Sequence, residues 1–264
     1  MKTKYYAALL LVMVMALPAC TVFQWGGPAK GTQDAAAAAA ADQPENIFKQ
    51  GESLLAKGKY DEARKKYSEI REHDPEKYYD ALVQVRLGDS YYEEARYAEA
   101  EVEYNRFLEL HPKNKAAPYV LYQVGMCNFK QIDLPDRDPS FATNSVTDFQ
   151  KLLSDFPGNP YEDEAKEKLR IAKADLAQHE FIVGSYYYNK HSYNAAAKRF
   201  KGILDTYPGS KDEPKVLYFL ADSYILMGNF DSAKNTLAVL YQQYPNNQFA
   251  EKAKKRLAEK IPQK

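Results

Sequence analysis

Residues 88–112 read GDSYYEEARYAEAEVEYNRFLELHP, and the spacing within this stretch recurs along the chain. An aromatic residue, Tyr97, is followed by a small residue three positions later, a bulky one after four more and a proline after another eight. Five such settings make the chain a repeat array. They are Tyr60, Ala63, Tyr67, Pro75; Tyr97, Ala100, Tyr104, Pro112; Ala142 (beside Phe141), Ser145, Phe149, Pro157; Tyr193, Ala196, Phe200, Pro208; and Phe230, Ala233, Leu237, Pro245.

A residue with almost no side chain stands nine positions before the aromatic one, except in the third setting, where an insertion intervenes. These small residues are Gly51, Gly88, Gly125, Gly184 and Ala221. This spacing is the frame of the tetratricopeptide helix-turn-helix unit. Small residues let two antiparallel helices approach closely, aromatics pack between neighbours, and proline ends the second helix. We therefore predict an all-α tetratricopeptide-repeat solenoid of about five helix-turn-helix repeats with a C-terminal capping helix.

The predicted domain covers residues 45–264. Its repeats are expected at about 45–76, 78–113, 116–158, 161–209 and 213–246. The capping helix, about 248–261, alternates Lys and Glu with Ala and Leu, which suits a polar outer face.

The first 19 residues have the features of a secretory signal. Lys2 and Lys4 precede an apolar run that is too short to span a membrane, and small residues close it before Cys20. This end resembles the bacterial lipobox, although Pro18 departs from it, and the resemblance implies a covalent lipid on Cys20. Thr21, rather than Asp, implies sorting to the outer membrane. The alternative is an ordinary signal peptide with an incidental cysteine.

Residues 20–44 form the predicted lipidated N-terminus and a flexible tether. Three glycines and Pro28 break regular structure, and the alanine run 35–41 is too short to be helical alone. Extended, the segment would reach roughly 80 Å. A leader without a spacing role is the alternative.

Composition argues against nucleic-acid binding and catalysis. The chain has 36 basic and 36 acidic residues, and loss of Lys2 and Lys4 with the signal leaves a charge of −2, so no basic surface is offered to nucleic acid. His179 and Glu180 begin like a zinc-protease helix, but Val183 stands where the second His should be. We predict no enzyme activity, no metal and no cofactor besides the lipid, and we expect Cys127 to be buried.

The predicted groove wall comes from the first helix of each repeat. Positions three before, one after and four after each small residue are expected to face it: Phe48, Glu52 and Leu55; Val85, Asp89 and Tyr92; Tyr122, Met126 and Phe129. Aromatics and acids here favour an extended segment with alternating aromatic side chains over a carboxylate clamp. The alternative is that these residues are interhelical core.

Two features depart from a regular array. The distance from the proline to the next small residue is thirteen in three junctions but twenty-seven from Pro157 to Gly184, which predicts about four extra helical turns starting near Tyr161. In addition, a loop at 131–140 is inserted within the third unit.

The loop and its surroundings resemble the BamD family of outer-membrane β-barrel assembly lipoproteins. The loop reads Leu134-Pro135-Asp136-Arg137-Asp138-Pro139, and the match in order and spacing continues through Asp148, Phe149, Leu152, Phe156, Tyr161, Ala165, Leu169, Leu176, Glu180, Val183 and Tyr186. The close resemblance covers about residues 134–208. A looser resemblance extends from the lipobox to near Pro245.

The resemblance implies a periplasmic scaffold, held at the outer membrane by its lipid anchor, without nucleic-acid partners. Its C-terminal repeats would grip a periplasmic domain of the barrel-forming subunit, with Arg199 facing an acid there. Its N-terminal repeats would meet unfolded outer-membrane protein precursors. Arg137, Asp138 and Pro139 are expected to be a structural loop, with Arg137 tying carboxylates and Pro139 fixing the entry to the next helix.

Another class of function would be a generic tetratricopeptide lipoprotein that links the outer membrane to cell-wall or division machinery. Such a protein would have no reason for the inserted loop. A hydrolytic enzyme with a repeat domain is disfavoured because the five repeats and the tether occupy the chain.

Overall fold

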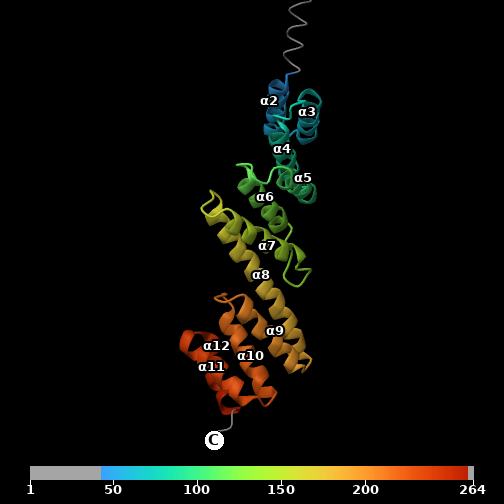
Figure 1. Ribbon diagram of the computed structural model, residues 1–264. Coiled ribbons are helices and arrows are strands. Elements are labelled where there is room, and N and C mark those ends of the chain that lie inside the picture. The colour runs from blue at the N-terminus through green and yellow to red at the C-terminus, as the bar shows by residue number, and fades with distance from the viewer. Residues whose placement is uncertain (1–42, 261–264) are drawn as a thin grey trace, which may run out of the picture. The chain divides into compact units, whose positions relative to one another are not determined.

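The computed structural model describes residues 43–260, and every regular element in this range is a helix (Figure 1). The helices are α2 (Pro44–Ala56), α3 (Tyr60–His73), α4 (Asp80–Glu93), α5 (Tyr97–Leu110), α6 (Ala117–Lys130), α7 (Ser140–Asp155), α8 (Glu162–Asn189), α9 (Tyr193–Thr206), α10 (Glu213–Leu226), α11 (Phe230–Gln243), α12 (Gln248–Arg256) and the short 3-10 helix η1 (Ala258–Lys260).

Consecutive helices pack in pairs that coincide with the predicted repeats. The pairs are α2 with α3, α4 with α5, α6 with α7, α8 with α9, and α10 with α11. Each second helix also packs against the first helix of the next pair, and α12 packs against α10 and α11. The predicted all-α tetratricopeptide fold is confirmed.

Close helix approach within each pair depends on the small residue. A methyl group on Gly184 would lie 2.6 Å from the ring of Phe200, and one on Gly51 would lie 2.6 Å from Tyr67. The facing rings are fully buried. In the fifth pair, Leu237 stands at the position of the ring, and Ala221 and Leu237 lie in the same buried cluster. Glycine is thus paired with a ring, and alanine with a smaller side chain.

Proline and left-handed backbone positions set the helix ends. Each predicted proline lies two residues after the last residue of its second helix, where it cannot continue the helix. The turns within four repeats contain a residue with positive φ. These residues are Gly58 (70°), Ala95 (60°), His191 (57°) and Gly228 (74°).

Helix α8 has 28 residues, whereas α6 and α10 have 14 each. The predicted extra four turns and their start are therefore confirmed. The helix packs against both α7 and α9. Ala165 and Ala172, in its first half, are completely buried, as the predicted apolar stripe requires.

The C-terminal helix is shorter than predicted. It ends at Arg256 rather than continuing to residue 261, and the 3-10 helix follows. Ala250, Ala253 and Leu257 are its fully buried residues, and they span only about two turns. Pro262 disfavours helical backbone in the residue before it, which favours an early end of the helix.

Candidate peptide-binding groove and partner site

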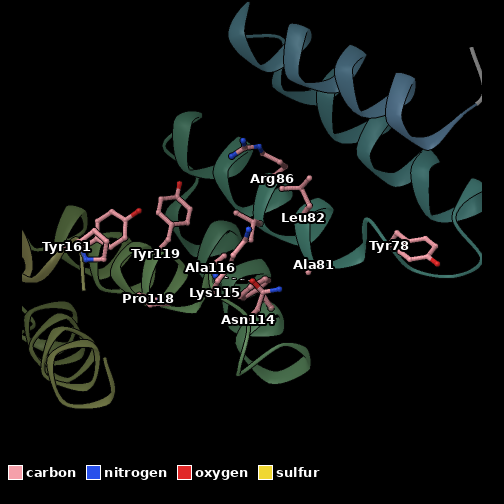
Figure 2. Close-up of a pocket in the computed structure, with 13 residues that line it drawn as sticks. Tyr78, Ala81, Leu82, Arg86, Asn114, Lys115, Ala116, Pro118, Tyr119 and Tyr161 are labelled. Carbon is pink, nitrogen blue, oxygen red and sulfur yellow. Dashed lines mark hydrogen bonds between the residues drawn. The ribbon is translucent and has the colours of Figure 1, made fainter. Parts of the chain in front are cut away.

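A cavity of about 730 Å³ opens between the second, third and fourth repeats. Its walls come from α4 and a residue before it, from Phe107 of α5, from the turn into α6 and the start of α6, and from the two residues before α8. Tyr119 and Tyr161 lie at one end, Tyr78 lies at the other, and Leu82 and Arg86 lie between them (Figure 2). Tyr78 is 79% exposed and Leu82 39% exposed, so both present apolar surface at the mouth of the cavity.

Ionic and phenolic groups form a continuous network beside this cavity. The Arg86 guanidinium donates to Glu52 Oε1 at 2.9 Å and to Asp89 Oδ2 at 2.8 Å. The hydroxyls of Tyr104 and Tyr119 donate to Asp89 Oδ1 at 2.8 and 2.7 Å. Burial and the nearby Asp89 carboxylate raise the pKa of both phenols. The charge of Arg86 is therefore balanced within the protein.

The predicted groove residues of the first two repeats have different surroundings. Val85 lines the cavity. Phe48 packs 5.8 Å from Tyr67, centroid to centroid, and Leu55 packs on the same core cluster of the first repeat. Tyr92 makes an edge contact with Tyr97 across the turn of its own repeat. Of these four residues, only Val85 lines the cavity.

Helix α8 covers the groove positions of the third repeat. Tyr122 stacks on Tyr161 with ring centroids 5.1 Å apart and donates to Glu164 at 2.9 Å. Met126 is 8% exposed and packs in the cluster that includes Phe149 and Ala165. The expectation of an open wall at Tyr122 and Met126 is thus corrected. Its physical reason is the helical extension, which places the start of α8 against α6 and α7.

Sequence reasoning missed Tyr78, Lys115, Tyr119 and Tyr161 as lining residues. Tyr119 lies six positions before Gly125, on the same helical face as the position three before it. Extending the periodicity by one turn would have found it. Tyr78 and Lys115 precede their helices, so no helical pattern could have indicated them.

The inserted loop is tied to the start of α7 and to α8. Arg137 forms an ion pair with Asp133 within the loop, and Asp138 accepts from the Ser140 backbone N–H at 3.0 Å. The residue before α7 is Pro139. The ring of His179 on α8 lies 2.8 Å from the Pro135 carbonyl oxygen.

Arg199 lies on α9 with 46% of its side chain exposed. Its guanidinium forms an ion pair with Glu180 of α8 at 2.8 Å. A carboxylate from a partner would therefore compete with an existing internal pair.

Cys127 is buried, as expected, and burial raises the pKa of its thiol. Within residues 43–260, no cluster of three metal-binding side chains occurs, and no helix is long and apolar enough to cross a membrane. Cys20 and the predicted signal and tether up to residue 42 lie outside the described residues.

A family model described as "YfiO: Outer membrane lipoprotein" matches residues 40–236. The chain belongs to the YfiO family of outer membrane lipoproteins. Among YfiO-related proteins, the outer membrane protein assembly factor BamD of Rickettsia prowazekii is 28% identical over 203 residues, which cover 77% of this chain and 81% of the relative. The corresponding protein of Neisseria meningitidis serogroup A is 26% identical over 246 residues, 89% of this chain and 90% of the relative.

Among solved structures, this YfiO-family chain aligns with the one described as "TPR2AB-domain:pHSP90-complex of yeast Sti1". The sequence identity is 17% and the TM-score 0.42, over 82% of this chain and 84% of the other.

Proposed function

We propose that this protein is an outer membrane protein assembly factor. In this proposal it is a periplasmic scaffold, anchored in the outer membrane by a lipid on Cys20. It docks on the barrel-forming subunit of the β-barrel assembly machinery and helps to receive unfolded β-barrel precursors for insertion. The family match carries the proposal, and relatives named as assembly factors favour it over a generic scaffold linked to the cell wall.

The partner site proposed for the barrel-forming subunit is centred on Arg199. Its half-exposed guanidinium can exchange Glu180 for a carboxylate on a partner, since an exposed ion pair contributes only about 0 to 1 kcal/mol. The groove beside Val85, with its aromatic walls, is the proposed receiving site for precursors. Aromatic side chains there offer apolar area and ring contacts to an unfolded segment.

A mild-detergent pull-down from envelope membranes tests the docking proposal. Arg199→Glu creates repulsion with Glu180. It is therefore compared with the double variant Glu180→Arg/Arg199→Glu, which restores the internal ion pair with the two charges exchanged. If Arg199 binds a partner acid, both variants recover less of the barrel-forming subunit. Restoration by the double variant, or equal recovery in all three proteins, would refute the role of Arg199. Recovery of cell-wall or division proteins without a barrel partner would refute the assembly function.

Anchoring is tested separately with Cys20→Ser. The variant is expected to lose incorporation of labelled fatty acid and to leave the membrane fraction. Retention of both properties would refute lipidation at Cys20.

A further inference from the structure

The segment after the fifth repeat, residues 248–260, differs in charge from the repeats themselves. It holds five basic and two acidic side chains. These are Lys252, Lys254, Lys255, Arg256 and Lys260 against Glu251 and Glu259. The other described residues, 43–247, hold 27 basic and 32 acidic side chains. The C-terminal end of the array is therefore locally basic on a chain that is acidic elsewhere.

Three of these cations share one face of α12. Lys252, Lys255 and Arg256 are three and four residues apart, so their side chains are neighbours on the helix surface. The fully buried Ala250 and Ala253 lie on the other side of the helix, in the core that α12 forms with α10 and α11. We call the face that carries the three cations the basic face of α12.

Two cations of the basic face are not neutralised within the protein. Lys255 and Arg256 are exposed, and neither forms an ion pair with another residue of 43–260. Glu251, the acid on the same helix, is paired with Lys254 at 3.0 Å. The charges of Lys255 and Arg256 therefore remain available to a partner.

The composition of the basic face indicates a flat anionic partner. Among the described residues from 248 to 260, no large apolar side chain is exposed. Protein interfaces depend on a desolvated apolar or aromatic centre, which this face does not offer. Clusters of Lys and Arg on an amphipathic helix instead bind anionic lipids, whose phosphate groups form a continuous negative surface.

We propose that the basic face of α12, formed by Lys252, Lys255 and Arg256, binds the surface of a bilayer that contains anionic phospholipids. The contact is electrostatic and does not insert the helix, because the apolar side of α12 is already buried against the last repeat. The inference rests on the proposed lipid anchor at Cys20 and adds a second contact with the membrane. An anchored chain is held near the surface at a high effective concentration, so a weak contact is enough to orient its C-terminal end.

Vesicle sedimentation tests this contact with the chain that lacks the signal and carries Cys20→Ser, so that no lipid is attached. Vesicles of phosphatidylcholine alone are compared with vesicles that contain about one third phosphatidylglycerol. The chain should bind only the anionic vesicles, and the binding should weaken as salt is raised from low concentration to about 0.15 M.

The double variant Lys255→Gln/Arg256→Gln removes the two unpaired cations. It should weaken binding to the anionic vesicles about ten- to thirtyfold at low salt, because each cation near such a surface contributes about a factor of five. The matched control is Lys57→Gln/Lys113→Gln, which removes two exposed lysines outside the basic face and gives the same net charge. The control should bind like the parent chain.

The outcomes separate this inference from the proposed anchor and assembly role. Equal sedimentation with neutral and anionic vesicles, or equal weakening by both double variants, would refute a lipid contact at the basic face. Absence of vesicle binding, together with reduced recovery of the barrel-forming subunit by Lys255→Gln/Arg256→Gln in the pull-down, would assign the face to a protein partner and overturn the proposal. None of these results bears on lipidation, which the fatty-acid labelling of Cys20 measures independently.

Discussion

The pairing of a small residue with a buried ring predicts strong coupling between Gly184 and Phe200. In Gly184→Ala, the new methyl group would lie 2.6, 3.0 and 3.2 Å from three atoms of the Phe200 ring. The ring cannot withdraw freely, because it is fully buried and contacts Phe181 and Phe219 at centroid distances of 5.4 and 5.9 Å. Overpacking costs about 1 to 3 kcal/mol, partly offset by about 1 kcal/mol of helix propensity. We expect a net loss of up to about 2 kcal/mol in the free energy of unfolding.

Replacing the ring should rescue this loss. Phe200→Leu alone removes buried apolar area and should cost about 1 to 2 kcal/mol. In the double variant Gly184→Ala/Phe200→Leu, the methyl group occupies part of the vacated space, as in the natural combination of Ala221 with Leu237. Its stability should lie within about 1 kcal/mol of the wild type, which requires a favourable coupling of more than about 1 kcal/mol.

Urea unfolding followed by circular dichroism measures the cycle. Gly202→Ala on α9, the helix that carries Phe200, is the control, because its new methyl group would have no neighbour within 4 Å. That variant should be about 0.5 to 1 kcal/mol more stable than the wild type. The packing argument would be refuted if the effects of Gly184→Ala and Phe200→Leu on the free energy of unfolding summed to the effect of the double variant within about 0.5 kcal/mol.

Three further results are expected. Burial raises the pKa of the Asp148 carboxyl to about 6, so the folded state binds this proton more tightly than the unfolded chain and the contribution of Asp148 to stability falls from pH 4 to 6. The difference in the free energy of unfolding between Asp148→Asn and the wild type should therefore shift by about 1 to 2 kcal/mol in favour of the variant from pH 4 to pH 7.5. Urea titrations at both pH values measure it, and a difference that does not change with pH would contradict this. Ala95→Gly, at φ 60°, should raise the free energy of unfolding by about 0.5 kcal/mol, whereas Ala174→Gly, an exposed control in the interior of α8, should lower it by about 1 kcal/mol. The Cys127 thiol should react with Ellman's reagent only after unfolding, and rapid labelling of the native protein would show that it is accessible.

The repeat frame could be predicted from the sequence because its signals are local and periodic. Proline positions, the small residue nine before each aromatic, and the long spacing before Gly184 gave the helix pairs and the length of α8. These features depend on the backbone geometry of single helices and turns, which the chain encodes within short windows.

Only the tertiary structure decided which groove positions border the cavity. Helical periodicity puts Val85 and Met126 on equivalent faces and both are buried, yet Val85 borders the cavity and Met126 does not. The difference arises because the first half of α8 packs against the third repeat, a contact between distant segments that no local pattern specifies. The cavity wall at Tyr78, Lys115 and Tyr161 likewise depends on residues brought together from separate repeats, since their packing is set by the whole array rather than by their own helices.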